Sequence, residues 1–148
     1  MYQRSTHDKI NPNYPKEAFM FNVDQELPAS QIILNDVHAK AAGSEKIAQA
    51  ISQLVGSGKA ILVQNNNSII VLINLDDGSA EIHLYTVDPP HRLASAMKYF
   101  HDELVKSGIH KVYGTEMPDK QLIKLMLAVG IPVDKSDKPD YYWMAPVQ

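Results

Sequence analysis

The fold of this chain is decided by residues 80–131, AEIHLYTVDPPHRLASAMKYFHDELVKSGIHKVYGTEMPDKQLIKLMLAVGI. Their apolar spacing predicts a strand, an amphipathic helix, a second strand and a second helix, in that order. At the first junction, Asp88 is expected to cap the helix and Pro89 to take its first position, where a missing N–H costs nothing. A strand, a helix and a strand in this order predict a right-handed parallel βαβ unit.

Each predicted helix of this stretch has one apolar face. Ala96, Phe100 and Leu104 lie four residues apart and form the apolar stripe of the first helix. The second helix is expected to begin at Asp119 and to be closed by Gly130. Both helices are therefore predicted to pack against the sheet.

Three short strands form an antiparallel meander, the last of them leading into this unit. They are expected at residues 60–64, 68–75 and 81–87, with turns at 65–67 and 76–78. The middle strand is almost entirely apolar, which predicts burial on both faces. The third strand alternates, so Glu81, His83 and Tyr85 are expected on one face and Ile82 and Leu84 on the other.

The remaining segments complete a mixed sheet. Residues 30–41 and 44–55 have helical apolar spacing, and residues 140–145 predict a final aromatic strand. Residues 132–139 are predicted to be a polar loop. The expected fold class is α/β with a mixed α+β sheet, in which helices cover both faces.

The chain divides into an arm and one domain. Residues 1–28 are rich in Asn, Pro, Tyr and charge, and predict an extended arm that wraps the domain or reaches a partner. Alternating apolar residues favour a strand near 18–24, and a free tail is the alternative. Residues 29–148 are expected to form the single domain, as the chain length suggests.

Composition excludes several classes of protein. The net charge of −3 and the absence of Lys/Arg runs argue against nucleic-acid binding. The absence of cysteine excludes disulfides, thiolate-ligated zinc and a cysteine nucleophile. No apolar run is long enough to span a bilayer, and the N-terminus has no apolar signal region, so we expect a cytoplasmic protein without membrane contact.

The order of elements over about residues 30–146 resembles the GNAT superfamily of N-acetyltransferases. LYTVDPPHR at 84–92 is similar to the family's central strand and the approach to its cofactor motif. The helix at 122–131 resembles the family's last helix, and DYYWM at 140–144 resembles its terminal strand. The resemblance implies an antiparallel meander followed by a βαβ unit, with the central strand diverging from its parallel neighbour.

The resemblance also implies a site for acetyl-CoA. In this family the pantetheine arm pairs with the open edge of the central strand, and the pyrophosphate binds at the N-terminus of the next helix, where free N–H groups and the helix dipole favour an anion. The cofactor-binding residues that it implies here are Tyr85, Val87, Arg92, Leu93, Ala94, Ser95, Ala96 and Met97.

The cofactor motif of the family, Gln/Arg-x-x-Gly-x-Gly/Ala, can be placed in two registers. With Arg92 first, the glycine positions hold Ser95 and Met97, and the methionine is expected to crowd the pyrophosphate or the neighbouring strand. The register one residue earlier holds His91, Ala94 and Ala96. We prefer the first register because it keeps the arginine and the apolar stripe of the helix.

Catalytic groups implied by the resemblance lie on the central strand and its neighbour. Glu81 and His83 are candidates to accept a proton from the incoming amine. The family often uses a tyrosine in its last helix as general acid, but that position holds Met126. Tyr113 or Tyr85 is the alternative acid.

Two functions remain open from the sequence. The first is an acyl-CoA-dependent N-acyltransferase that transfers an acetyl group to a small-molecule or protein amine. The second is a catalytically inactive GNAT-fold binding or assembly module. Small bacteriophage GNAT-like proteins have similarly eroded motifs, which would place such a module in the host cytoplasm or a virion. The arm at 1–28 would then mediate homo-oligomers or assembly.

Other chemistry-bearing residues have ordinary explanations. The six histidines are scattered without metal-binding spacing, so no metal site is predicted. Tyr141, Tyr142 and Trp143 can form a stacking platform for bases, but a terminal strand more often packs such residues in its core.

Overall fold

The computed structural model describes residues 26–147, which form one mixed sheet flanked by helices. The elements are α3 (Ala29–Asn35), α4 (Val37–Ala42), α5 (Ser44–Gly56), β1 (Ala60–Asn65), β2 (Ser68–Asn74), β3 (Ser79–Thr86), α6 (Pro90–Lys106), β4 (Lys111–Gly114), α7 (Lys120–Ala128), β5 (Asp134–Lys135) and β6 (Trp143–Pro146). The strand predicted near 18–24 lies outside the described residues.

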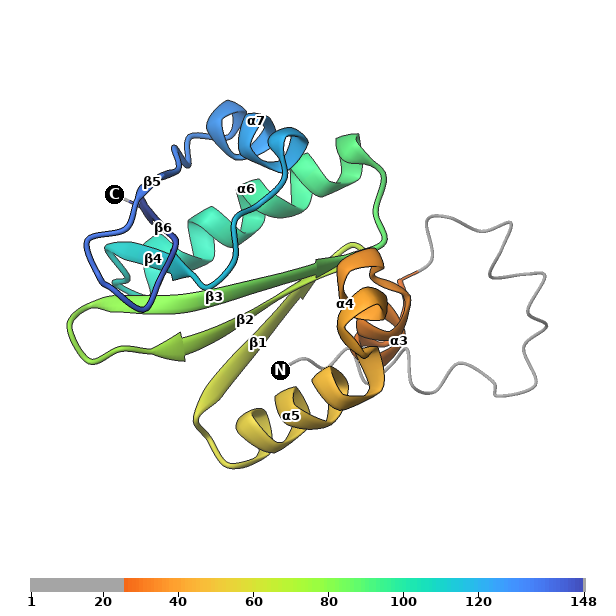
Figure 1. The fold of residues 1–148 in the computed structure, drawn as a ribbon. Coiled ribbons are helices and arrows are strands. Elements are labelled where there is room, and N and C mark those ends of the chain that lie inside the picture. The colour runs from red at the N-terminus through yellow and green to blue at the C-terminus, as the bar shows by residue number, and fades with distance from the viewer. Residues whose placement is uncertain (1–25, 148) are drawn as a thin grey trace, which may run out of the picture.

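The sheet has the order β1-β2-β3-β4-β6-β5. β1, β2 and β3 pair antiparallel as a meander, β3 and β4 pair parallel, and β6 pairs antiparallel with both β4 and β5. Figure 1 shows α3, α4 and α5 on one side of the sheet and α6 and α7 on the other. The predicted fold class, a meander followed by a β3-α6-β4 unit with helices on both faces, is confirmed.

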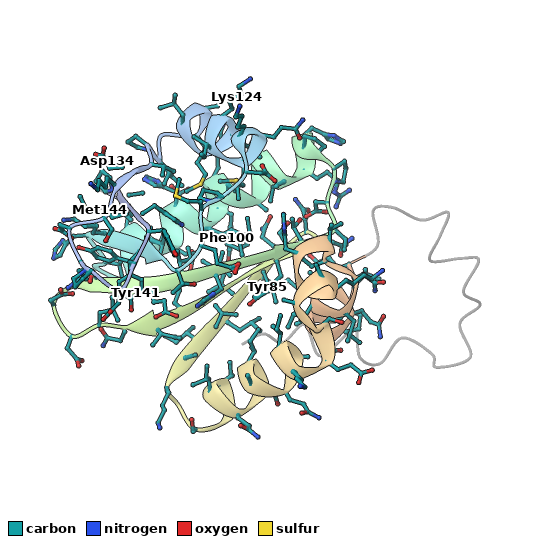
Figure 2. The ribbon with its side chains drawn as sticks, in the orientation of Figure 1. Tyr85, Phe100, Lys124, Asp134, Tyr141 and Met144 are labelled. Carbon is teal, nitrogen blue, oxygen red and sulfur yellow. The ribbon has the colours of Figure 1, made fainter. Side chains whose placement is uncertain are left out.

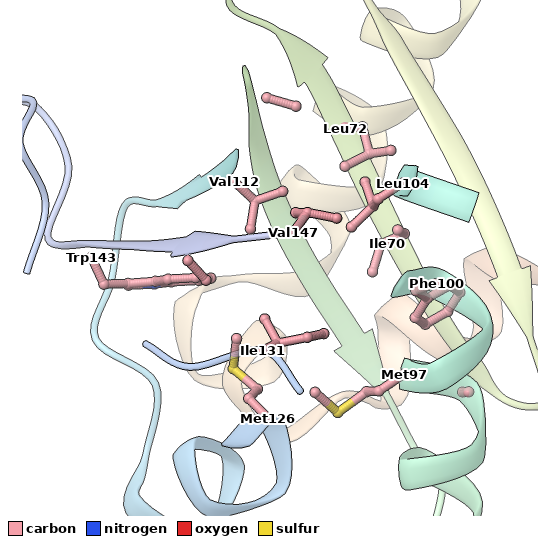
Figure 3. Close-up of a cluster of buried hydrophobic side chains, with 13 residues drawn as sticks. Ile70, Leu72, Met97, Phe100, Leu104, Val112, Met126, Ile131, Trp143 and Val147 are labelled. Atoms are coloured by element: carbon pink, nitrogen blue, oxygen red, sulfur yellow. The ribbon is translucent and has the colours of Figure 1, made fainter. Parts of the chain in front are cut away.

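Two apolar clusters sandwich the sheet because β2 is apolar on both faces. Ile70 and Leu72 face α6, where they join the predicted helix stripe in one cluster, drawn in Figure 3. Ile69 and Val71 face the other way and pack with Ile32 and other residues of α3 and α5. The burial of β2 on both faces is confirmed and accounts for its lack of polar alternation.

Both hairpin turns use residues suited to left-handed backbone. Asn66 has φ 53° in the β1–β2 turn, and asparagine tolerates this conformation better than most residues. In the β2–β3 turn, Asp76 has φ 67° and Gly78 has φ 83°. The two predicted turns are therefore confirmed.

The first predicted helix is divided at Asp36. This residue has extended backbone (φ −65°, ψ 133°), and its side chain accepts from the N–H of Ala39 to cap α4. A second acceptor bond, from the N–H of Thr86 at 2.9 Å, ties the break to the end of β3. The single helix at 30–41 was the wrong prediction because periodicity does not register a capping side chain inside an apolar pattern.

Several boundaries also differ from the prediction. α6 begins one residue later, with Pro89 rather than Asp88 at the N-cap, because Asp88 turns its carboxylate toward the β1–β2 turn. Apolar spacing predicts this strand from Ile109 through Tyr113, but β4 begins at Lys111 because the N–H of Ile109 closes α6 by donating to Leu104 O. The predicted loop at 132–139 contains the short edge strand β5, and a turn in which Tyr141 N donates to Lys138 O delays β6 to Trp143.

Candidate functional site

β3 and β4 pair only over their first residues. Their parallel ladder runs from Ser79–Lys111 to Glu81–Tyr113, while β3 continues to Thr86. β4 ends at Gly114 and the chain turns away from the sheet. The second half of β3 therefore has an edge with which no strand of the described chain pairs.

The register of the meander shows which backbone groups face that edge. Val87 N donates to Asn67 O and Leu75 N donates to Ser79 O, so odd-numbered residues of β3 bond to β2. Because bonding direction alternates along a strand and the ladder with β4 ends at the Glu81–Tyr113 pair, the amide group of Leu84 points toward the open side.

A cavity of about 200 Å³ lies beside this edge. Its walls come from α4, the second half of β3, the segment after β4 and the start of α7. The side chains and backbone that line it include His38, Ala39, Ile82, His83, Leu84, Tyr85, Glu116, Met117, Leu122 and Trp143. The cavity therefore combines an apolar wall with several ionisable groups.

Glu81 and His83 are joined to each other and to Tyr141. His83 Nε2 lies 2.6 Å from Glu81 Oε2, and the Tyr141 hydroxyl donates to Glu81 Oε1 at 2.8 Å. His83 lines the cavity, whereas Glu81 lies behind it on the same face of β3. Tyr141, Glu81 and His83 thus form a hydrogen-bonded row, and the His83 imidazole is the member of the row that faces the cavity.

Tyr85 also lines the cavity, near α4. Burial raises the pKa of Tyr85 to about 12, and the nearby carboxylates of Asp36, Glu116 and Glu81 add to that rise. Figure 2 labels Tyr85 toward the end of β3, beside α4, and Tyr141 toward its start. The Tyr85 phenol is therefore a neutral hydrogen-bond donor at physiological pH.

Tyr113 occupies a different place. It is buried on β4, and its hydroxyl donates to Asp137 Oδ1 at 2.7 Å. Burial and this hydrogen bond raise the pKa of Tyr113 to about 12. Tyr113 packs against the ring of Tyr141 at 5.4 Å between centroids and is not among the lining residues of the cavity.

The junction between β3 and α6 is held by internal hydrogen bonds. Val87 N donates to Asn67 O, and Asp88 N donates to the Thr86 hydroxyl at 2.9 Å. Pro89 and Pro90 have no N–H to offer. The free N–H groups expected at this turn are therefore largely used or missing in the described conformation.

Arg92 faces the β1–β2 turn. Its Nη2 donates to Asn66 Oδ1 at 3.1 Å, and its Nε lies 3.7 Å from Asp88 Oδ1. The Asp88 side chain is only 1% exposed and accepts from Asn67 N and the Ser68 hydroxyl. Arg92 thus balances a buried carboxylate next to the start of α6.

The other residues implied for the cofactor lie along the first two turns of α6. Leu93 and Ala94 are half-buried, Ser95 is exposed, and Ala96 is fully buried. Met97 points into the core, where Figure 3 shows it near Met126. It lines an apolar cavity of about 70 Å³ that shares Ile82, Leu84, Leu122 and Trp143 with the larger cavity.

Sequence reasoning missed three residues of this region. Asp36 and Glu116 contribute negative charge around Tyr85, and Tyr141 holds Glu81 although its strand pattern predicts packing. A polar residue inside an apolar helical pattern was the signal for Asp36. Glu116 and Tyr141 carry no local signal, because their contacts come from the turns of the chain after β4 and before β6.

Two general features bear on the chemistry available. Over residues 26–147, no three His, Asp or Glu side chains gather closely enough to hold a metal ion. In the same part of the chain, no helix is long and apolar enough to cross a membrane.

Comparisons with protein-family models and with curated proteins found no match. Among solved structures, the chain is similar to yncA from Salmonella typhimurium, which is described as a putative acetyltransferase with its cofactor acetyl-CoA. The identity is 13%, 70% of each chain is covered, and the TM-score is 0.44. The assignment of the fold rests on the sheet order and strand directions described above.

Proposed function

We propose that the protein is an acyl-CoA-dependent N-acyltransferase that moves an acetyl group from acetyl-CoA to an amine. The observation that carries the proposal is the open edge of β3 beside a cavity that His83 lines, with Glu81 bound behind the imidazole. An amide-bearing thioester donor and a proton acceptor for the amine then meet at one place.

The backbone of β3 would hold the donor. The amide group of Leu84 faces the open side, and the pantetheine arm carries amides that can pair with it as a strand does. The apolar walls shared by the two cavities, including Leu122 and Trp143, would cover the arm. Water would thereby be kept from the thioester.

His83 would accept the proton of the amine. As the nitrogen attacks the thioester carbonyl, a C–N bond forms, the C–S bond breaks and the proton passes to the imidazole. Glu81 orients the ring and stabilises its protonated form, as a carboxylate behind a histidine does. The leaving thiolate is less basic than a phenol of pKa about 12, so Tyr85 would stabilise it by donating a hydrogen bond.

The test begins with donor binding. Acetyl-CoA at roughly 100 times its Kd is expected to raise the free energy of unfolding by about 2.7 kcal/mol, measured by thermal shift. The backbone NMR signals of Leu84 should move more than those of Glu81 and His83. No stabilisation at millimolar acetyl-CoA would refute the proposal.

Turnover is then measured by thiol release across a panel of amines. His83→Gln is expected to lower kcat by about 100-fold or more, while the KM for acetyl-CoA stays close to that of the parent protein. His101→Gln on α6 is the matched control, since His101 bonds to Val147 O away from the cavity. Equal losses in both variants would exclude His83 as the base.

A binding or assembly module without catalysis is the second candidate. It is favoured by the β3–α6 junction, where two prolines, bonded N–H groups and the buried Asp88 carboxylate leave little room for a pyrophosphate. Arg92, predicted to bind that group, would have to leave Asn66 and Asp88 to do so. A bacteriophage virion or assembly role belongs to this candidate, and purification as a defined complex without acetyl-CoA binding would support it.

A further inference from the structure

The His83 imidazole uses one of its two ring nitrogens for the hydrogen-bonded row. Nε2 lies 2.6 Å from Glu81 Oε2. Within residues 26–147, no hydrogen bond involves the other ring nitrogen, Nδ1. The His83 side chain is 30% exposed and lines the cavity, so Nδ1 is the ring nitrogen that remains available to a bound molecule.

The charge of Glu81 decides which ring nitrogen carries the hydrogen. A glutamate side chain is normally ionised at neutral pH and then only accepts hydrogen bonds. A neutral imidazole that meets a carboxylate through Nε2 must place its hydrogen on Nε2 and leave Nδ1 as the acceptor. The contact between Glu81 and His83 therefore selects one tautomer of the ring.

Tyr141 occupies the second oxygen of the same carboxylate. Its hydroxyl donates to Glu81 Oε1 at 2.8 Å. Burial, together with this hydrogen bond, raises the pKa of Tyr141 to about 12, so the hydroxyl keeps its hydrogen at physiological pH. With a donor fixed on Oε1, the carboxylate is kept from turning and Oε2 remains directed at His83.

Contacts other than the bond to Glu81 hold the Tyr141 ring in place. The ring packs against that of Tyr113 at 5.4 Å between centroids, and the Tyr113 hydroxyl donates to Asp137 Oδ1. The next residue, Tyr142, donates its N–H to Gly114 O at 2.9 Å. Removal of the Tyr141 hydroxyl alone should therefore leave the ring where it is.

We infer that Tyr141 is a positioning residue that acts through Glu81 to keep the hydrogen of His83 on Nε2, which makes Nδ1 the atom that takes the proton of the amine. The role of Nδ1 rests on the proposed acyltransferase activity, whereas the tautomer does not. As the amine nitrogen bonds to the thioester carbon and the C–S bond breaks, the amine proton moves to Nδ1. The ring then carries a hydrogen on both nitrogens, and Nδ1 afterwards gives its proton to the thiolate or to water.

Nitrogen-15 NMR of the full-length protein without ligand tests the tautomer. Correlations from the ring hydrogens distinguish a protonated from an unprotonated nitrogen, and His83→Gln identifies the signals by their loss. At a pH where the ring is neutral, the wild-type protein should show the hydrogen on Nε2 alone. Glu81→Gln should give a mixture of tautomers, because an amide can donate as well as accept. A hydrogen on Nδ1 in the wild-type protein would overturn the inference.

Tyr141→Phe keeps the ring and removes the hydroxyl. Because Glu81 can then turn away, the single tautomer of His83 should become a mixture. Tyr113→Phe is the matched control, since it removes the same kind of bond, to Asp137, from the neighbouring ring and should leave the His83 signals as in the wild type. No change in Tyr141→Phe, or equal changes in both variants, would show that Tyr141 does not position the imidazole.

Turnover separates this role from the proposed function. With acetyl-CoA and an accepted amine, Tyr141→Phe should lower kcat by roughly tenfold, a part of what a general base contributes, and leave the KM for acetyl-CoA unchanged. Tyr142→Phe, at an exposed neighbouring ring, should leave both constants unchanged. Turnover with an unchanged kcat in Tyr141→Phe would overturn the inference and leave the proposed function standing. A tautomer that depends on Tyr141 in a protein without turnover would overturn the proposed function and support the positioning.

Discussion

Gly114 shows how one residue sets the fit between two strands at the cavity. It pairs with Trp143, and a Cβ added at Gly114 would overlap the indole nitrogen and its neighbouring carbons. Both residues line the cavity. The missing side chain is therefore what allows the tryptophan to lie flat across β4.

Gly114→Ala is expected to lower the free energy of unfolding by about 1–3 kcal/mol, because the indole or the backbone must shift to relieve the overlap. Denaturant unfolding measures the change. Gly56→Ala, where an added Cβ meets no atom within 4 Å, is the control and should be neutral or slightly stabilising. An unfolding midpoint for Gly114→Ala equal to that of wild type would contradict the overlap.

At the residue scale, the sequence predicts the face of a strand or helix on which a side chain lies, but seldom the distant residue that it contacts. Strand alternation places Glu81 and His83 side by side, and their side chains do meet at 2.6 Å. The bond between Tyr141 and Glu81 joins residues 60 apart in the sequence, and that between Arg92 and Asn66 joins residues 26 apart. Such contacts depend on how elements pack, which no local pattern contains.

At the scale of elements, Asp36 links two helices to the sheet. Its carboxylate caps α4 through Ala39 N and accepts from Thr86 N, while the side chain is buried. Asp119 caps α7 through Leu122 N, is exposed, and has one further contact at the surface, 3.7 Å from Oδ2 to His38 Nε2. The two aspartates thus have the same local role with different tertiary consequences.

Asp36→Ala is expected to cost about 2–4 kcal/mol, since it removes a helix cap and leaves the Thr86 N–H without its acceptor. Asp119→Ala, the matched control, should cost about 1 kcal/mol. Thermal or denaturant unfolding of both variants provides the comparison. Equal costs would mean that the bond to Thr86 contributes nothing.

Element types were predicted better than element ends. The spacing of Ala96, Phe100 and Leu104 defines α6 and its buried face, and the predicted beginning of the second helix at Asp119 agrees with α7, whose N-cap is Asp119. The ends depend on single hydrogen bonds. Asp36 divides a helix, and Asp88 leaves the N-cap of α6 for the β1–β2 turn, both because a carboxylate finds a distant donor.

At the scale of the whole molecule, three tyrosine phenols lose their protons less readily in the folded protein than in the unfolded chain. Burial, strengthened by nearby carboxylates or by bonds to them, raises the pKa of Tyr85, Tyr113 and Tyr141 to about 12 in each case. In the unfolded chain a tyrosine titrates near pH 10. The folded state therefore holds more protons than the unfolded state between these values.

Stability is accordingly expected to be unaffected by these phenols below about pH 10 and to fall as pH rises from about 10 to about 12. Tyr85→Phe removes one of the three groups and should reduce the steepness of that fall by about a third. Urea unfolding at a series of alkaline pH values measures the slope. An unchanged slope would show that Tyr85 ionises as readily in the folded protein as in the unfolded one.

The whole arrangement was predictable because each level of the sequence agrees with the next. Short turns force the antiparallel meander, and the helix between β3 and β4 forces the parallel pair. What could not be predicted is where that pair ends. The divergence after Glu81 depends on the four-residue length of β4 and on Gly114 beside Trp143, and both are set by packing.

Pro89 and Pro90, which follow β3, have a consequence for exchange of molecules at the cavity. Their rings lock two successive φ angles, so the chain has less freedom to hinge where β3 passes into α6. If a molecule enters or leaves the cavity, we therefore expect the opposite wall, formed by α4 and residues 115–117, to move more readily than the β3–α6 junction. The residence time of a molecule bound in the cavity would then depend on movements of that opposite wall, while the β3–α6 junction keeps its position.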